Sequence, residues 1–202
     1  VPRCPACNEP LFVWVETKAD REDQLVDRCE NCGLVVARDA VPSPDEAAAE
    51  LLVRAEQRGE SIAVRADNAA SLQTWLGAEN WAALRSGGHD VKPTPRAASL
   101  LLARRGYELR RVRHLARPGM AAMWQTLLNL LTFHRDFASQ TASGRLRPGT
   151  GRGRAAFWID VLVTVLAAVP TAILAVVLEG AAVIARRGGV IELQAERLPV
   201  AD

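Results

Sequence analysis

The sequence predicts an α/β fold in which a small cysteine-rich ribbon comes first and a long apolar insertion interrupts the last strand pair. Three observations support this prediction. All four cysteines of the 202-residue chain fall within its first 32 residues. Helical and strand-like segments then alternate, which is typical of an α/β layer. Finally, an apolar run over residues 157–184 comes shortly before a segment with strand-like alternation.

The four cysteines form two Cys-x-x-Cys motifs, Cys4 with Cys7 and Cys29 with Cys32. The two-residue spacing lets both thiolates of a motif reach one ion, and two motifs complete a tetrahedral site. Four thiolates suit zinc and leave no coordination position open. We therefore predict a structural zinc ion, not a catalytic one.

Residues 1–40 are predicted to form a zinc ribbon of three short strands. These strands are expected at residues 11–15, 24–28 and 34–37. Gly33 follows the second cysteine motif, where the backbone must turn tightly. So small a ribbon buries too little apolar surface to fold alone, so metal would supply the missing stability. It is either a structural support or a docking module for a protein or nucleic acid.

The charge pattern does not favour nucleic acid as a partner. The formal net charge is only +2, which provides little general attraction for a phosphate backbone. Basic residues of the ribbon are offset by acidic neighbours: Lys18, Arg21 and Arg28 against Glu16, Asp20, Glu22 and Asp23. The first residues have no signal-peptide pattern, so we expect reduced thiols and a metal site in preference to disulfides.

A helix and a strand are predicted after the ribbon. Ser43 to Glu46 form a capping box with proline at the first helical position, which marks a helix start. The helix is expected to continue as far as Gly59. Residues 61–67 are then predicted to form a short buried strand.

A second helix and strand are expected after a loop over residues 68–92. The helix begins at Thr94, which is again followed by proline, and ends at Gly106. Residues 107–115 are predicted to form a strand. Its apolar residues do not keep a single parity, so we expect a bulge or an exposed apolar residue.

A set of short motifs occurs in a recognisable order in this region. His89 is followed by Thr94-Pro95, then by Gly106-Tyr107-Glu108, and finally by a late strand. In this respect the chain resembles the carboxy-terminal half of class I S-adenosylmethionine-dependent methyltransferases, over residues 43–115 and 188–200. The resemblance implies a truncated Rossmann-like half. It also implies that His89 is the candidate proton acceptor, the alternative being a loop histidine that caps backbone groups.

The half of the methyltransferase fold that binds the cofactor has no counterpart in the chain. In that family the cofactor lies on a Gly-rich turn after the first strand, and no room exists for it between Ala37 and Ser43. Residues 149–153 match Gly-x-Gly-x-Gly, but no apolar strand precedes them, so we interpret them as a linker. We therefore expect neither S-adenosylmethionine binding nor methyl transfer by this chain alone.

The last strand is predicted to pair antiparallel with residues 107–115, as the resemblance implies. Its apolar and polar residues alternate: Ile191, Leu193 and Ala195 against Glu192, Gln194 and Glu196. Arg110, Arg111 and Arg113 on the partner strand make cross-strand charge pairs with the two glutamates feasible. Residues 116–187 would then be an insertion between two paired strands.

The first part of this insertion is predicted to be an amphipathic helix. Its apolar residues have helical spacing: Met120, Met123, Trp124, Leu127, Leu128 and Leu131. We expect it to lie in the bilayer interface with Trp124 at headgroup depth. Packing on the rest of the protein is the alternative.

The second part is the apolar run, for which three arrangements are open. Asp160 and Glu179 bracket an uncharged stretch about as long as a bilayer core if it is one helix, which suits a single pass. If the flanking strands pair, however, both ends of the insertion must lie on one side. That favours an in-plane anchor, or a re-entrant one that turns at Pro170. Burial within the protein is the third possibility.

Arginines flank both ends of the apolar run, which predicts that both ends lie at the cytoplasmic face of the membrane. Those before it are Arg145, Arg147, Arg152 and Arg154. They either contact anionic headgroups or lie in a solvated linker.

Three functions are compatible with these features. The first is a membrane-associated, methyltransferase-like protein that lacks the cofactor half and acts as a non-catalytic accessory or scaffold. The second is a methyltransferase acting on a lipid-linked or small acceptor, with a partner chain that supplies the missing half. The third is a membrane-tethered zinc-ribbon adaptor that binds a protein.

Overall fold

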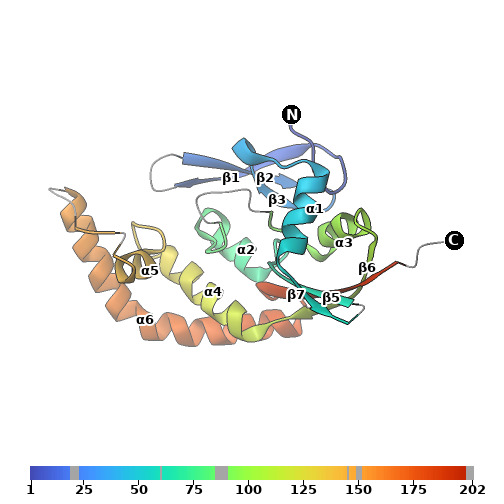
Figure 1. Cartoon of the computed structure of the whole chain (residues 1–202). Coiled ribbons are helices and arrows are strands. Elements are labelled where there is room, and N and C mark those ends of the chain that lie inside the picture. Colours follow the sequence, from blue (N-terminus) through green and yellow to red (C-terminus); the bar gives the residue numbers. More distant parts are fainter. Residues whose placement is uncertain (19–22, 60, 85–90, 145, 149–151, 199–202) are drawn as a thin grey trace.

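The structure is a computed structural model that describes residues 1–18, 23–59, 61–84, 91–144, 146–148 and 152–198. It contains two antiparallel sheets and a helical arm that ends in one long apolar helix (Figure 1). His89 lies outside the described residues, as do three residues of the Gly-x-Gly-x-Gly string.

The first sheet contains the three strands predicted for the amino-terminal ribbon. They are β1 (Leu11–Lys18), β2 (Asp23–Cys29) and β3 (Val35–Ala37), paired antiparallel in that order. A register shift between Val13 and Val15 bends β1. A short 3₁₀ helix, η1 (Arg38–Ala40), connects the sheet to the rest of the chain.

Helix α1 (Pro44–Val53) begins at the predicted capping box. The backbone nitrogen of Glu46 donates to the Ser43 hydroxyl at 3.3 Å, and the Ser43 nitrogen donates to the Glu46 carboxylate at 2.8 Å. These two bonds satisfy amide groups that have no partner within the helix.

The predicted continuation of this helix to Gly59 is wrong. Residues Ala55–Arg58 form strand β4, which pairs antiparallel with β5 (Ser61–Asp67). Gly59 follows β4 with φ +67, a left-handed conformation used in tight turns. The composition of this segment is compatible with a helix, but pairing with β5 overrides that local preference.

The second sheet has the strand order β4-β5-β7-β6, with β6 at Tyr107–His114 and β7 at Val190–Arg197. The predicted antiparallel pairing of the last strand with residues 107–115 is confirmed, with Val112 opposite Leu193. The predicted bulge in β6 is also confirmed, since the register shifts between Leu109 and Arg111. Within the described residues every strand pair is antiparallel. The Rossmann-like identity of the second sheet stays a prediction.

One of the predicted cross-strand charge pairs forms and the other does not. Arg110 contacts Glu196 at 3.0 Å. Glu192 instead contacts arginines on the opposite side of β7, Arg58 at 3.3 Å and Arg65 at 3.8 Å. Strand β7 lies between β5 and β6, so its carboxylates can pair with either neighbour.

The segment predicted as a loop over residues 68–92 contains helix α2 (Leu72–Gly77) and the short helix η2 (Ala78–Asn80). The Ser71 hydroxyl caps α2 by accepting from the Thr74 nitrogen at 3.1 Å. Helix α3 (Pro95–Ala103) begins at Thr94, as predicted.

One hydrophobic core joins the ribbon to the second sheet. Side chains of the ribbon, of α1 and α3, and of β5 and β7 belong to the same buried cluster. The inward residues of β7 are those predicted from its alternation, Ile191, Leu193 and Ala195, each with no exposed surface. Neither the ribbon nor the sheet therefore has a separate core of its own.

The insertion forms three helices: α4 (Ala116–Asn129), α5 (Phe137–Ala142) and α6 (Arg152–Ile184). Helix α6 is continuous through Pro170, so of the arrangements left open the re-entrant one with a turn at that residue is wrong. A proline removes one hydrogen bond and can bend a helix without ending it. In Figure 1, α6 curves along the side of the molecule opposite the ribbon, with α4 lying between α6 and α2.

Candidate metal centre and apolar helix

The two cysteine motifs adopt the same backbone turn. In each, the amide four residues after the first cysteine donates to that cysteine's carbonyl at 2.8 Å, from Asn8 to Cys4 and from Gly33 to Cys29. Both donors are in the left-handed region, with φ of 63 and 73. This turn brings the two thiols of a motif toward one side of the loop.

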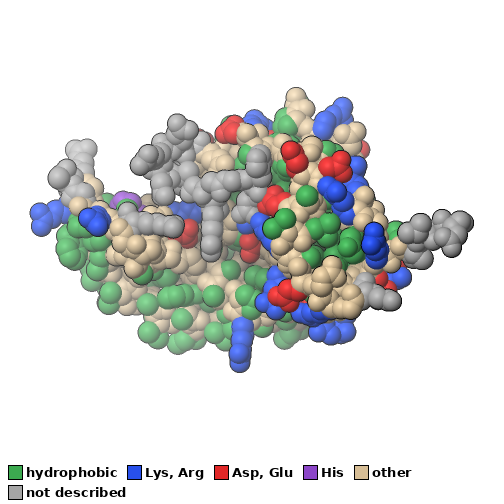
Figure 2. All heavy atoms as spheres, viewed as in Figure 1, with side chains coloured by type: hydrophobic (Ala, Val, Ile, Leu, Met, Phe, Trp, Pro, Cys, Tyr) green, Lys and Arg blue, Asp and Glu red, His purple; other side chains and the backbone are tan. Residues whose placement is uncertain are grey.

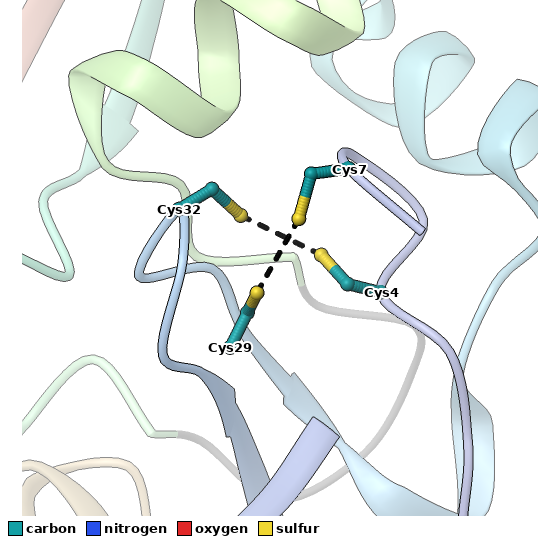
Figure 3. Close-up of side chains that lie close together, drawn as sticks. All are labelled: Cys4, Cys7, Cys29 and Cys32. Atoms are coloured by element: carbon teal, nitrogen blue, oxygen red, sulfur yellow. Dashed lines mark hydrogen bonds between the residues drawn. The ribbon is translucent and has the colours of Figure 1, made fainter. Parts of the chain in front are cut away.

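The four sulfur atoms converge on one point (Figure 3). All lie within 4.8 Å of one another, with Cys4 and Cys32 at 3.5 Å and Cys7 and Cys29 at 3.4 Å. Four sulfurs bound tetrahedrally at about 2.3 Å from an ion would be about 3.8 Å apart. The predicted ligands are thus brought together with spacing that a single metal ion fits.

Hydrogen bonds between the thiols prepare the cluster for a cation. The bond from Cys32 lowers the pKa of Cys4 to about 5, although burial opposes this shift. The same bond raises the pKa of Cys32, and burial raises the pKa of Cys29. Because thiolates are the form that binds a metal, an ion that binds here would release thiol protons.

The second cysteine motif is held against the start of α3. The Thr94 hydroxyl donates to the Cys32 carbonyl and also accepts from the Ala97 nitrogen at 3.1 Å, so one side chain caps the helix and fixes the motif. A Cβ added at Gly33 would lie 2.7 Å from the Thr94 methyl group. The cysteine cluster is therefore part of the core that the ribbon shares with the second sheet.

A cavity of about 800 Å³ lies beside α4, lined by Arg54, Arg65, Trp124, Asp136 and several alanines. Among the described residues that line it there is no histidine and no cysteine.

Helix α6 presents an apolar surface to the outside. Every exposed residue from Trp158 to Val177 is apolar, and Figure 2 shows hydrophobic side chains along the edge of the molecule that α6 forms. By length and composition α6 could cross a membrane, and it is the only such helix among the described residues. Only 11% of its most apolar stretch is buried, unlike a core helix of a soluble protein.

Asp160, Thr171 and Glu179 on the inner face of α6 have hydrogen-bond partners in the protein, whereas the buried Thr164 hydroxyl has none among the described residues. Near one end, Asp160 has no exposed surface and accepts from the backbone nitrogens of Phe133 and His134 at 2.8 and 2.9 Å. It also pairs with Nδ1 of His134 at 2.7 Å. With two backbone amides on the same carboxylate, we interpret this pair as a structural clamp.

In the middle of α6, the Trp124 indole donates to the Ala168 carbonyl at 3.1 Å and to the Thr171 hydroxyl at 3.0 Å. The polar atom of Trp124 is thus bound by α6, and the headgroup depth expected for this residue stays a prediction. The polar side of α4 is also used, since Thr126 accepts from the Ala82 nitrogen at 3.1 Å. Helix α4 thus packs between α6 and the rest of the protein.

At the other end of α6, Glu179 is completely buried. It accepts from the Gly189 nitrogen at 2.7 Å and from the Gln73 amide at 2.8 Å. The same amide donates to the Gly119 carbonyl at 2.7 Å. We call these four residues the Glu179 clasp. It joins α2, α4 and α6 immediately before β7 begins.

Sequence reasoning located the two acidic residues of α6 but not their partners. Asp160 and Glu179 were expected to bracket an uncharged membrane segment. Both carboxylates are instead buried against the protein, although a 19-residue spacing places them about 100° apart around an ideal helix. Small residues near Gly119 and Gly189 are the local sequence signal that the Glu179 and Gln73 side chains come close to the backbone at these two glycines.

Comparisons of the chain with protein-family models, with curated proteins and with solved structures find no match. The roles of the cysteine cluster and of α6 are therefore inferred from their own geometry.

Replacing Gly119 by alanine should destabilise the packing of α6. The added Cβ would collide with the Glu179 carboxylate, and such overpacking typically lowers the free energy of unfolding by about 1–3 kcal/mol. Gly180→Ala is the matched control, because a Cβ there meets nothing within 4 Å and alanine favours a helix. Urea unfolding of both variants measures the difference; equal stabilities would contradict the clasp.

Proposed function

We propose that this protein is a non-catalytic scaffold or accessory protein attached to the cytoplasmic face of a membrane by α6 and stabilised by zinc in its ribbon. The observation that carries the proposal is the division of α6 into two faces. Its Asp160, Thr171 and Glu179 side chains make buried contacts with the protein, whereas its exposed side chains from Trp158 to Val177 are apolar. A lipid surface satisfies such a face without further polar partners.

Zinc is the ion that the cysteine cluster fits best. Four thiolates at near-tetrahedral spacing are a structural zinc set, and they leave no position for a bound water that could react. Cys4, Cys29 and Cys32 are buried in the core shared with the second sheet. Zinc would therefore stabilise the whole body of the protein as well as the ribbon.

The methyltransferase-like part is proposed to serve as a scaffold. Strand β5 is paired on both sides, with β4 and with β7, so a partner chain could add strands only outside β4 or β6. Both of these edge strands carry charged residues, a feature that discourages strand addition. These edges favour a non-catalytic role over completion of a catalytic domain by a partner.

A second candidate function, an adaptor that binds a protein through the ribbon, is favoured by one observation. Phe12 and Val13 on the edge strand β1 are about half exposed, at 48% and 50%. Exposed apolar residues on an edge strand are suited to contact with another protein. Membrane attachment and a zinc ribbon are common to both candidates.

Replacement of one ligand should release the ion. Cys29→Ser is expected to lower zinc from one ion per chain to nearly none, and to unfold the ribbon, because three thiolates hold zinc far less tightly. Glu30→Ser is the control, since Glu30 is exposed in the same loop. Zinc analysis and circular dichroism report the outcome. Unchanged zinc in the Cys29 variant would refute a four-cysteine site.

S-adenosylmethionine should not bind to the zinc-loaded protein. The chain lacks the Gly-rich turn that the family uses, so calorimetry is expected to show no heat of binding. Micromolar binding would overturn the non-catalytic proposal and favour a methyltransferase that acts with a partner chain. The membrane and zinc proposals would be unaffected.

A charge on the outer face of α6 should weaken membrane attachment. Val169→Glu is expected to reduce binding to lipid vesicles about tenfold, because a carboxylate enters lipid at a cost. Val53→Glu is the matched control, since Val53 is 86% exposed on α1, whereas Val169 is 67% exposed on α6. Vesicle flotation measures the binding of both variants. Wild-type protein that does not float with the vesicles would contradict the proposal.

A further inference from the structure

We propose that α6 lies flat in one leaflet of the bilayer, with anionic headgroups at both of its ends, and does not cross the membrane. This inference rests on the proposed membrane attachment and adds its geometry and its lipid class. Three observations support it: protein contacts along the inner face of α6, the ties between both of its ends and the body of the protein, and the arginines at the two ends of its apolar face.

Contacts hold the inner face along most of its length. Asp160 is clamped by the residues after α4, Trp124 binds near the middle, and Glu179 closes the clasp near β7. At about 1.5 Å per residue, the two carboxylates lie about 28 Å apart along the axis. Throughout this distance one face of α6 is turned toward protein and the opposite face away from it.

The carboxy-terminal end of α6 is fixed to the second sheet. Gly189, which donates to Glu179, immediately precedes β7. In addition, the Asn68 side chain after β5 donates to the Gly188 carbonyl at 3.0 Å. This end therefore lies at the level of the sheet.

The amino-terminal end is fixed to the same body by another route. Asp160 holds His134, and the next residue, Arg135, donates to the Trp81 carbonyl. Trp81 is fully buried in a cluster with Val26 and Val35 of the ribbon sheet. Both ends of α6 are thus tied to one continuous body, which places both on the same side of a membrane.

A crossing arrangement would place these polar contacts in hydrocarbon. Helix α4 would have to enter the bilayer with α6, yet its 14 residues span only about 21 Å of a core about 30 Å thick. The Asp160 clamp and the connected Trp81 contact would then lie on the far side, separated from the ribbon core. If α6 lies flat in one leaflet, its polar contacts stay out of the hydrocarbon core and remain joined to the ribbon core.

The ends of the apolar face favour anionic lipid. Arg154 is exposed at one end, and Arg186 and Arg187 are exposed at the other. Arginines at headgroup level attract anionic headgroups. A second copy fits less well, since parallel or antiparallel packing of two α6 faces would bring these arginines close to one another.

Depth measurements on the zinc-loaded full chain test the geometry. Spin labels at introduced cysteines in place of Ile159, Val169 and Val177 cover about 27 Å of the helix. Accessibility to oxygen and to a nickel chelate then gives the depth of each label in vesicles of phosphatidylcholine and phosphatidylserine. Unsubstituted protein, whose four cysteines hold zinc, gives the background labelling.

A flat helix predicts three equal, shallow depths. A middle label roughly 13 Å deeper than the outer two would show a crossing helix and overturn this inference, while membrane attachment itself would stand. Strong coupling between labels of different molecules without vesicles would show that a second copy covers the face, which also overturns it. No binding to vesicles would defeat the proposed function as well.

The lipid class has its own test. Replacing Arg186 and Arg187 by serine should weaken binding to phosphatidylserine-containing vesicles about 30-fold, with little effect on phosphatidylcholine vesicles. The control replaces Arg104 and Arg111, exposed residues of the sheet body, by serine. Equal losses in both double variants would contradict headgroup contacts at the end of α6.

Discussion

The pairing of β7 with β5 and β6 is the constraint on which the rest of the molecule depends. Helix α6 ends at Ile184, and β7 begins only six residues later, in the centre of the four-stranded sheet. The chain therefore has to reach the four-stranded sheet within these few residues. The Glu179 clasp makes this return possible, because the buried carboxylate accepts the backbone amide of Gly189 just before the strand. Sheet order and membrane geometry are linked through this short connection.

Consequences of that constraint extend to both faces of α6. A helix held at both ends by one body needs polar partners on its inner side, and Asp160 and Glu179 have them. Its exposed side chains from Trp158 to Val177 are apolar. The cysteine cluster lies in the core shared by ribbon and sheet, so a metal ion bound there would stiffen the body to which α6 is attached.

Features that depend on local sequence signals were predicted better than features that depend on contacts between distant segments. The capping residues Ser43 and Thr94 and the cysteine cluster were predicted, because each depends on the spacing of residues in short motifs. The β6–β7 pair joins distant segments, and it was predicted from the family resemblance. Strand β4 was not, since its sequence is compatible with a helix and only β5 determines its conformation. At Pro170 the sequence left one continuous helix and a turn both open, and the structure has one helix. His89, the candidate proton acceptor, lies outside the described residues and stays a prediction.

Nuclear Overhauser effects across the β6–β7 ladder, recorded on zinc-loaded protein bound to lipid nanodiscs, test this constraint most directly. Val112 and Leu193 are opposite each other in the register, and their backbone protons should give cross-strand contacts in the bound state. The account predicts these contacts, with slow amide exchange throughout β7. Loss of both in the presence of lipid, while the ribbon remains folded, would contradict it, because α6 would then be free to leave the body and cross the membrane.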